Sequence, residues 1–377
     1  MERDTTPELR AMKPDTLTGS LWMLFLYDVS EEIRLNQLRE ILGMQPAGRE
    51  PSFRCPVPEY VRFEKPPVVE IAPPIVLETG QRMETRINYY EYGVVSIALE
   101  LPFGCQWEEL VDLASRWIAS PELEKRAEET LQQHLERASQ ALADPYAQRL
   151  SEDYCIIHLR QLCKEDGSRV RATELIADHG AEIAQIVRGE RIPLSEDEKL
   201  EILQSRMSYY PDDLLVVGWT AAFLYDTPEG AVPILQLLEY ANSQLLDFRH
   251  YDEVLTRVLK EVHPSLGKRR SFLARWRLAR DAERLNTIRL DVEELTERMD
   301  NSIKFLSDMF SARVYRLAAA KVGVLDYRRL VDEKLRTAAD LYRSMMDQFH
   351  QGSAFVLELM IVIILIIDLI FLFRGKS

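Results

Sequence analysis

The sequence predicts an α+β globular part of one or two ferredoxin-like (split βαβ) units, then long coiled-coil-like helices and one C-terminal transmembrane helix. Three observations lead to this fold class. Strand and helix patterns recur in the same order within residues 1–266, an apolar stripe at helical spacing follows them, and a mostly apolar run lies near the end. The chain of 377 residues has an apolar fraction of 46%, which suffices for packed cores in two or three structural units.

The first unit with its proline-rich connector is expected at residues 1–119. The apolar run 21–27 predicts a buried strand, and Ser120 followed by Pro121 predicts the start of a helix at the end of this unit. The other expected elements are a helix at 30–42, a connector at 46–74, strands at 83–89 and 93–101, and a helix at 107–118. A helical linker at 120–150 follows, because the proline of Asp144-Pro145 stops the helix.

The second unit is expected at residues 151–266 and repeats the order of strands and helices. The expected elements are a strand at 154–161, a helix at 172–187, a long strand at 214–225 and a helix from 228 to about 248. Both halves therefore resemble strand-helix-strand-strand-helix units.

The helical stalk is expected at residues 267–352. Apolar residues from Leu285 to Phe349 recur at gaps of three or four, and no proline interrupts residues 271–373. A lone helix cannot bury such a stripe. The sequence leaves three options open: a hairpin at Gly323, docking on the globular part, or self-association into a homo-oligomer.

The transmembrane anchor and its short tail are expected at residues 353–377. The apolar run 354–373 has twenty residues, which at about 1.5 Å per residue would span about 30 Å, the hydrocarbon thickness of a bilayer. A buried core helix or a strand is the alternative. Glu358 and Asp368 lie inside the run, either as interfacial acids or as sites of helix pairing. Because the N-terminus lacks a signal sequence, the large N-terminal part is expected to be cytoplasmic, or on the matrix side of a mitochondrial membrane.

Charge is unevenly distributed. Residues 1–267 carry a net charge of −19 and residues 268–377 one of +5, which together give the −14 of the chain. The acidic part disfavours nucleic acid and anionic lipid as partners. The basic start of the stalk is a solvated face, a lipid contact or an RNA contact. Its residues are Lys268, Arg269, Arg270, Arg275, Trp276, Arg277 and Arg280.

The sequence contains no catalytic motif, so an enzyme is not expected. The six histidines are not spaced as metal ligands, the glycines form no phosphate-binding loop, and the four cysteines are expected to be reduced thiols. We therefore predict no catalytic residue, no cofactor and no metal site. The acids Asp212, Asp213, Asp226 and Glu229 flank the strand expected at 214–225, and loops at strand ends often carry function. Turn formation and helix capping explain Asp212, Asp226 and Glu229 without a catalytic role, which is the preferred interpretation.

Two segments resemble the required-for-meiotic-nuclear-division family of membrane-anchored proteins. One is Leu357-Glu358, the apolar run after it and the second acid Asp368, where the family usually has glutamate. The other combines residues 282–286 with Arg289-Leu-Asp291. The resemblance implies a non-enzymatic role, since mitochondrial members support translation at the inner membrane by tethering ribosomes or messenger RNA. The acidity of residues 1–267 argues against direct RNA binding by the globular part.

Three functional hypotheses remain open at this point. The first is a membrane-tethered scaffold that binds an unknown protein partner, self-associates through its stalk and contacts membrane lipid. The second is a membrane-localised enzyme or nucleotide-binding regulator with its site at the strand ends. The third is an oligomeric membrane assembly that uses Glu358 and Asp368.

Overall fold

The structure is a computed structural model with two compact units. It describes residues 16–44, 66–77, 80–118, 120–162, 168–262, 280, 283–290, 292–293 and 309–374, without the side chains of 345, 348–359 and 367–374. Unit 1 holds Met1–Asp247 and Asn301–Leu325, and unit 2 holds Phe248–Asp300 and Asp326–Ser377.

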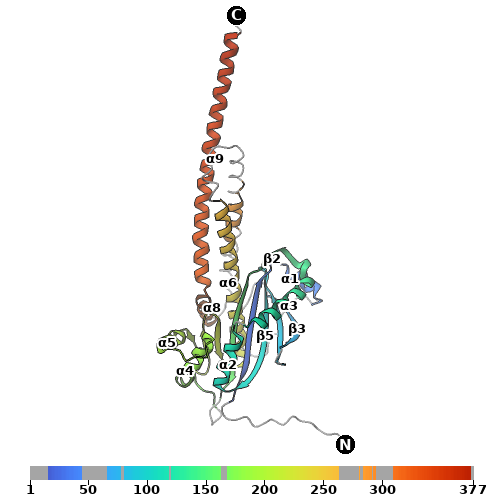
Figure 1. Ribbon diagram of the computed structural model, residues 1–377, viewed down its shortest axis with the longest axis vertical. Helices are drawn as coiled ribbons and strands as arrows, with labels where there is room; N and C mark the ends of the chain where they lie inside the picture. The colour runs from blue at the N-terminus through green and yellow to red at the C-terminus, as the bar shows by residue number, and fades with distance from the viewer. Residues whose placement is uncertain are drawn as a thin grey trace. The chain divides into compact units, whose positions relative to one another are not determined.

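The elements follow one another as strands and helices in alternating groups (Figure 1). The strands are β1 Leu17–Asp28, β2 Ser30–Ile33, β3 Val68–Val76, β4 Arg82–Tyr89, β5 Val94–Cys105, β6 Leu142–Pro145, β7 Ser151–Gln161, β8 Arg206–Met207, β9 Leu214–Val217 and β10 Ala221–Tyr225. The helices are α1 Leu35–Ile41, α2 Trp107–Trp117, α3 Pro121–Ala138, the short 3-10 helix η1 Ser139–Ala141, α4 Ala172–Arg188, α5 Glu196–Gln204, α6 Pro228–Val262, α8 Met309–Val322 and α9 Val324–Arg374.

A single eight-stranded sheet forms the centre of unit 1, in the order β3-β4-β5-β1-β7-β10-β9-β8. Neighbouring strands are antiparallel, except that β7 and β10 are parallel. The strands expected in two separate units thus share one mixed sheet. The prediction of ferredoxin-like split-βαβ units is wrong, because β1 pairs with β5 on one side and with β7 on the other.

Strand β1 is buried on both faces. Its sequence LTGSLWMLFLYD is almost continuously apolar, and every residue except Thr18 is buried. Such a run is typical of a central strand that is covered on both sides. Gly19 allows β7 to approach closely, because a Cβ at this position would lie 2.1 Å from the carbonyl oxygen of His158.

Helices cover the two faces of the sheet. Met23, Phe25 and the other odd-numbered residues of β1 share one hydrophobic core with Leu110 of α2, Leu131 of α3 and Ile183 of α4. On the opposite face Asn88 of β4 donates a hydrogen bond from Nδ2 to Glu239 Oε1 of α6, at 2.6 Å. The first part of α6 therefore packs on the face that α2, α3 and α4 leave free (Figure 1).

The second core, under α6, contains buried acids. Asp28 and Asp247 are only 3% and 4% exposed. Oδ2 of Asp247 has no hydrogen-bond partner among the described residues. Burial, together with the nearby charge of Asp28, raises the pKa of Asp247 well above its ordinary range.

Both edges of the sheet are short or irregular. The edge strand β3 pairs only with β4, and its register shifts between Ala72 and Ile75, where Pro73 and Pro74 interrupt the ladder. At the opposite edge, β8 has only two residues.

Unit 2 buries much of the apolar stripe within the same chain. Leu285 and Ala338 form a hydrophobic cluster with Val258 of α6. The ammonium of Lys334 pairs with the carboxylate of Asp252, also on α6. At these residues the apolar stripe is buried within one chain and does not require a second copy to cover it. The described residues therefore give no support to the predicted coiled coil. Gly323, at φ +97°, separates α8 from α9, so the stalk is not one uninterrupted helix.

The prediction of a transmembrane anchor is corrected. In the part of the chain that the structure describes, no helix combines the length and the apolarity that are needed to cross a bilayer. Of the expected span, side chains are described only for residues 360–366, all apolar and 46–61% exposed. Single-pass membrane localisation, with a cytoplasmic or matrix-side N-terminal part, is corrected with it.

Replacing Gly19 with alanine is expected to lower the free energy of unfolding by about 1–3 kcal/mol, because the new methyl group would force β1 away from β7. Urea denaturation measures this change. Gly104→Ala is the matched control, since a Cβ at Gly104 on β5 meets no atom within 4 Å. Equal stability of the two variants would contradict the close approach.

Replacing Asp247 with asparagine is expected to raise the free energy of unfolding at neutral pH, by about 1–3 kcal/mol, since the buried acid must hold a proton against its ordinary pKa, whereas asparagine is neutral. Because the pKa of Asp247 is raised in the folded chain, the unfolded chain loses this proton at a lower pH than the folded chain does. The free energy of unfolding therefore falls as the pH rises above about 4. The variant should show a weaker fall than the wild type in melting curves over this range. Asp178→Asn, at an exposed position of α4, should change neither the free energy of unfolding nor its dependence on pH. A destabilised Asp247→Asn protein would refute this account.

Candidate functional site

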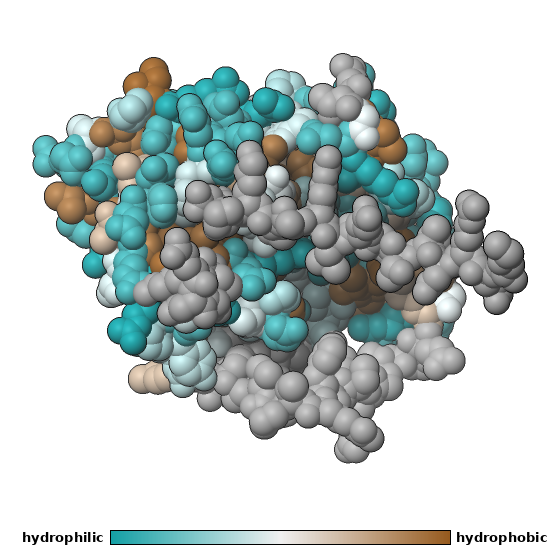
Figure 2. Space-filling view, turned by 90° about the horizontal axis from the view of Figure 1, so that it is seen from below, coloured by the Kyte–Doolittle hydropathy of each residue, from teal (hydrophilic) through white to brown (hydrophobic). Residues whose placement is uncertain are grey.

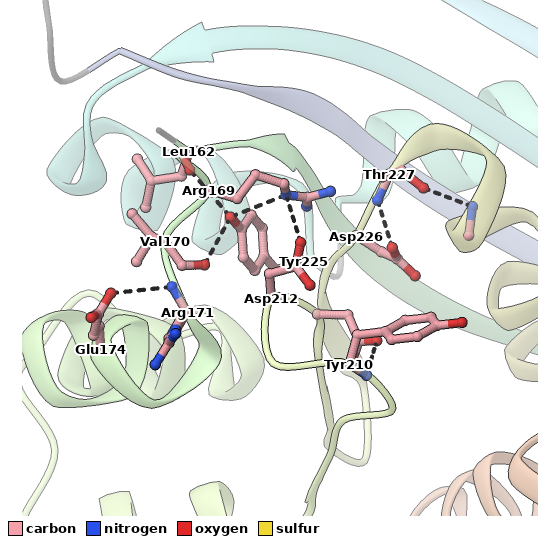
Figure 3. A network of polar contacts seen from close by, with 12 residues as sticks. Leu162, Arg169, Val170, Arg171, Glu174, Tyr210, Asp212, Tyr225, Asp226 and Thr227 are labelled. Carbon is pink, nitrogen blue, oxygen red and sulfur yellow. Dashed lines mark hydrogen bonds and ion pairs between the residues drawn. The ribbon is translucent and has the colours of Figure 1, made fainter. Parts of the chain in front are cut away.

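The candidate site lies where the two parallel strands of the sheet end. β7 ends at Gln161 and β10 at Tyr225, and the loops that follow them begin at the same end of the sheet. In sheets with parallel strands, side chains from such loops often form binding sites. The close-up in Figure 3 shows residues of these loops together with those of the loop before β9.

Arg169 packs on Tyr225 at the centre of the site (Figure 3). Its guanidinium carbon lies 4.8 Å from the centre of the Tyr225 ring. Its Nε lies 3.7 Å from Oδ2 of Asp212, an ion pair in which the carboxylate is 43% exposed. The hydroxyl of Tyr225 lies 3.2 Å from the carbonyl oxygens of Leu162 and Val170, and either oxygen can accept a hydrogen bond from it. Arg169 is therefore fixed by a ring and a carboxylate within the chain.

The loop before β9 presents two tyrosines to solvent. Asp213 accepts hydrogen bonds from the backbone N–H groups of Tyr209 and Tyr210, at 2.8 and 2.7 Å. The two rings are in edge-to-face contact at 4.7 Å, and Tyr209 also contacts Phe310 of α8 at 5.0 Å. Tyr209 and Tyr210 are nevertheless 58% and 63% exposed, and Met309, next to Phe310, is 75% exposed. We call the surface formed by Tyr209 and Tyr210 the tyrosine surface.

Asp226 and Thr227 start helix α6. The Asp226 carboxylate accepts a hydrogen bond from the N–H of Thr227 at 2.6 Å, and Thr227 Oγ1 accepts one from the N–H of Gly230 at 3.1 Å. Thr227 thus acts as the N-cap, which satisfies a free N–H group of the first turn. A Cβ at Gly230 would lie 2.5 Å from the Asp226 carboxylate, so glycine makes room for this side chain.

The protonation of the site depends mainly on burial. Burial raises the pKa of Asp226 to about 6; the Asp213 charge adds to this rise, whereas the Thr227 hydrogen bond and Arg169 oppose it. The neighbouring His158 ring lies 3.1 Å from the carbonyl oxygen of Asp226. Burial lowers the pKa of His158 to about 4, so this ring is neutral at neutral pH.

A hollow of about 330 Å³ lies elsewhere in unit 1, between the end of β5 and α2. Phe103, Cys105, Leu113 and Arg116 are among its lining residues. Burial raises the pKa of the Cys105 thiol to about 11, so the thiolate that a nucleophile requires is scarce at neutral pH. Within the described ranges no group of three histidine, cysteine, aspartate or glutamate side chains could hold a metal ion.

The residues singled out from the sequence are not brought together in this site. Lys268, Arg269, Arg270, Arg275, Trp276 and Arg277 lie outside the described residues, as do the side chains of Glu358 and Asp368. Arg280 is described and exposed in unit 2. The sequence predicts turn or cap roles for Asp212, Asp226 and Glu229. Asp213 and Asp226 do accept backbone hydrogen bonds, whereas Asp212 pairs with Arg169, a residue that the sequence did not indicate. No local pattern marks Arg169, because its partners Tyr225 and Asp212 are more than forty residues away.

Comparison with known proteins identifies the family. Residues 18–231 match the family described as "Uncharacterized protein MJ0711, N-terminal domain". The chain belongs to this family. The match begins in β1 and ends in the first turns of α6, so it includes the whole sheet and the candidate site.

One curated relative is the uncharacterized protein MJ0711 of Methanocaldococcus jannaschii. It is 18% identical over 195 residues, which are 52% of this chain and 60% of that protein. The chain thus matches less than two thirds of the length of this relative. No solved structure matches the chain. The resemblance to the required-for-meiotic-nuclear-division family is wrong, because it rested on motifs of helices and apolar runs that many proteins share. The tethering of ribosomes or messenger RNA loses its support with it.

Replacing Arg169 with glutamine is expected to raise the pKa of Asp226 above its value of about 6, because the variant lacks the positive charge that favours the carboxylate. Titration of the carboxyl carbon by NMR measures this shift. Arg188→Gln, which removes an exposed arginine from α4, is the matched control and should leave the titration unchanged. An unchanged or lower Asp226 pKa in the Arg169 variant would show that this charge does not act on the site.

Proposed function

We propose that the protein is a non-enzymatic binding protein that holds a partner protein at the tyrosine surface of unit 1. The observation that carries the proposal is the pair of hydrogen bonds that Asp213 accepts from the backbone of Tyr209 and Tyr210, which fixes two adjacent and largely exposed tyrosines. Tyrosine is enriched at protein interfaces, where it contributes a large contact area at a low cost in conformational entropy. A backbone that is already ordered lowers the cost of binding further.

The face of the molecule drawn in Figure 2 suits recognition by a few anchoring side chains. Figure 2 shows the molecule from below, and its coloured residues are mainly hydrophilic, with apolar residues in small groups. Interfaces of this kind obtain most of their affinity from a few aromatic side chains, surrounded by polar contacts. Asp212 and Glu229, both at least partly exposed, are polar groups in the loops of the candidate site.

A nucleotide-binding regulator at the strand ends is the second candidate. Arg169 favours it, because its buried Nη2 has no hydrogen-bond partner among the described residues. The charges around it oppose this function. Asp212, Asp213 and Asp226 are near enough to influence one another electrostatically, and they would repel a phosphate group. We therefore prefer a protein partner.

A photo-crosslinking amino acid at position 210 of the full chain, expressed in its native host, tests the proposal. We expect one discrete adduct, and we expect Tyr209→Ala to reduce its yield. An adduct of twice the mass of the chain would identify a second copy as the partner, as the predicted homo-oligomer requires. Ile192, which is 74% exposed outside the tyrosine surface, is the matched control position. An adduct at position 210 no more abundant than that at 192 would contradict the proposal.

A further inference from the structure

The chemistry of the tyrosine surface favours one class of partner. Two aromatic rings meet there edge to face, so that their faces are not stacked on each other. The electron-rich face of an aromatic ring attracts the ammonium of lysine and the guanidinium of arginine. Exposed tyrosine faces therefore provide a site for cations as well as for apolar groups.

Acidic side chains lie in the same loop as these rings. Asp212 and Asp213 follow Tyr210 after Pro211, and Asp226 lies close enough to Asp213 for the two charges to interact. Arg169 is the cation that acts on these acids, and it is already held by Tyr225 and Asp212. The wider field has the same sign, since residues 1–267 carry a net charge of −19. Such a field attracts cationic segments and repels phosphate and anionic lipid.

Among the described residues, arginine lies over an aromatic ring in two places. The guanidinium carbon of Arg169 lies 4.8 Å from the Tyr225 ring, and that of Arg86 lies 5.2 Å from the Trp22 ring. In the first case an aspartate, Asp212, also pairs with the arginine. Tyr210 stands on the other side of that aspartate, and its ring points away from the Arg169–Tyr225 stack in Figure 3. An arginine from outside would meet the Tyr210 ring and the carboxylate of Asp212, which is 43% exposed although its Oδ2 also pairs with Arg169.

We infer that the tyrosine surface recognises a protein segment that carries arginine or lysine side chains. This inference rests on the proposed function, and it adds the chemical class of the partner. The side chains of the partner would lie on the rings of Tyr209 and Tyr210, with their charges paired to Asp212.

A peptide of alternating arginine and glycine, compared with the same peptide containing neutral citrulline, tests the inference by fluorescence anisotropy with the full chain. We expect the arginine peptide to bind more tightly and its affinity to fall with added salt. Tyr209→Leu with Tyr210→Leu should weaken binding about fivefold to thirtyfold, whereas Tyr209→Phe with Tyr210→Phe should preserve it, because phenylalanine keeps the ring face. Circular dichroism would confirm that both double variants are folded.

Controls separate local recognition from the overall charge of the chain. Asp212→Asn should weaken binding at least twofold, whereas Glu128→Gln, which removes an exposed acid on α3, should not. Equal affinity for the arginine and citrulline peptides, or equal effects of the two acid variants, would overturn the inference. Undiminished binding of the arginine peptide by the Tyr209→Leu, Tyr210→Leu double variant would also overturn the inference. If the crosslink at position 210 still forms in that case, the partner-binding function stands and the cationic class of the partner is wrong.

Discussion

The pairing of β1 with both β5 and β7 is the constraint on which unit 1 depends. It joins strands from residues 17–105 to strands from residues 151–225 in one sheet, and it places β1 where helices must cover both of its faces. Because β7 is fixed by β1, its parallel partner β10 is fixed as well. The loops that carry Arg169 and Asp226 therefore follow strands of the sheet centre, whereas the two exposed tyrosines lie between β9 and the edge strand β8. Loops on such a scaffold keep their side chains in place without a large core of their own.

Local sequence predicted many elements, but it did not predict how they assemble. The apolar run at 21–27 lies within β1, and Ser120-Pro121 marks the start of α3, as their patterns indicated. The pairing of β1 with β7 joins residues more than one hundred positions apart, and neither strand carries a signal for it. Helix α6 continues through Pro233 to Val262, well beyond the end near residue 248 that the sequence suggested. At the C-terminus, composition alone favoured a span that the described residues do not support.

The candidate site illustrates the same limit at the level of single residues. Turn and cap chemistry explained why aspartates precede β9 and α6, and the hydrogen bonds of Asp213 and Thr227 agree with it. The sequence did not predict how these turns and caps position the residues next to them. Asp213 holds the backbone of two tyrosines that remain exposed, and the loop before α4 brings Arg169 onto Tyr225. Both effects depend on contacts between loops, which no periodic pattern records.

The irregular edges of the sheet restrict how another chain can attach to it. An exposed strand edge normally offers its backbone N–H and C=O groups to a foreign strand, which extends the sheet and leads to aggregation. Pro73 and Pro74 remove donors from β3, and β8 is too short to guide a new strand. Extension of this sheet by a strand of another chain is disfavoured at both edges. A partner that binds at these edges would therefore contact side chains instead of backbone groups.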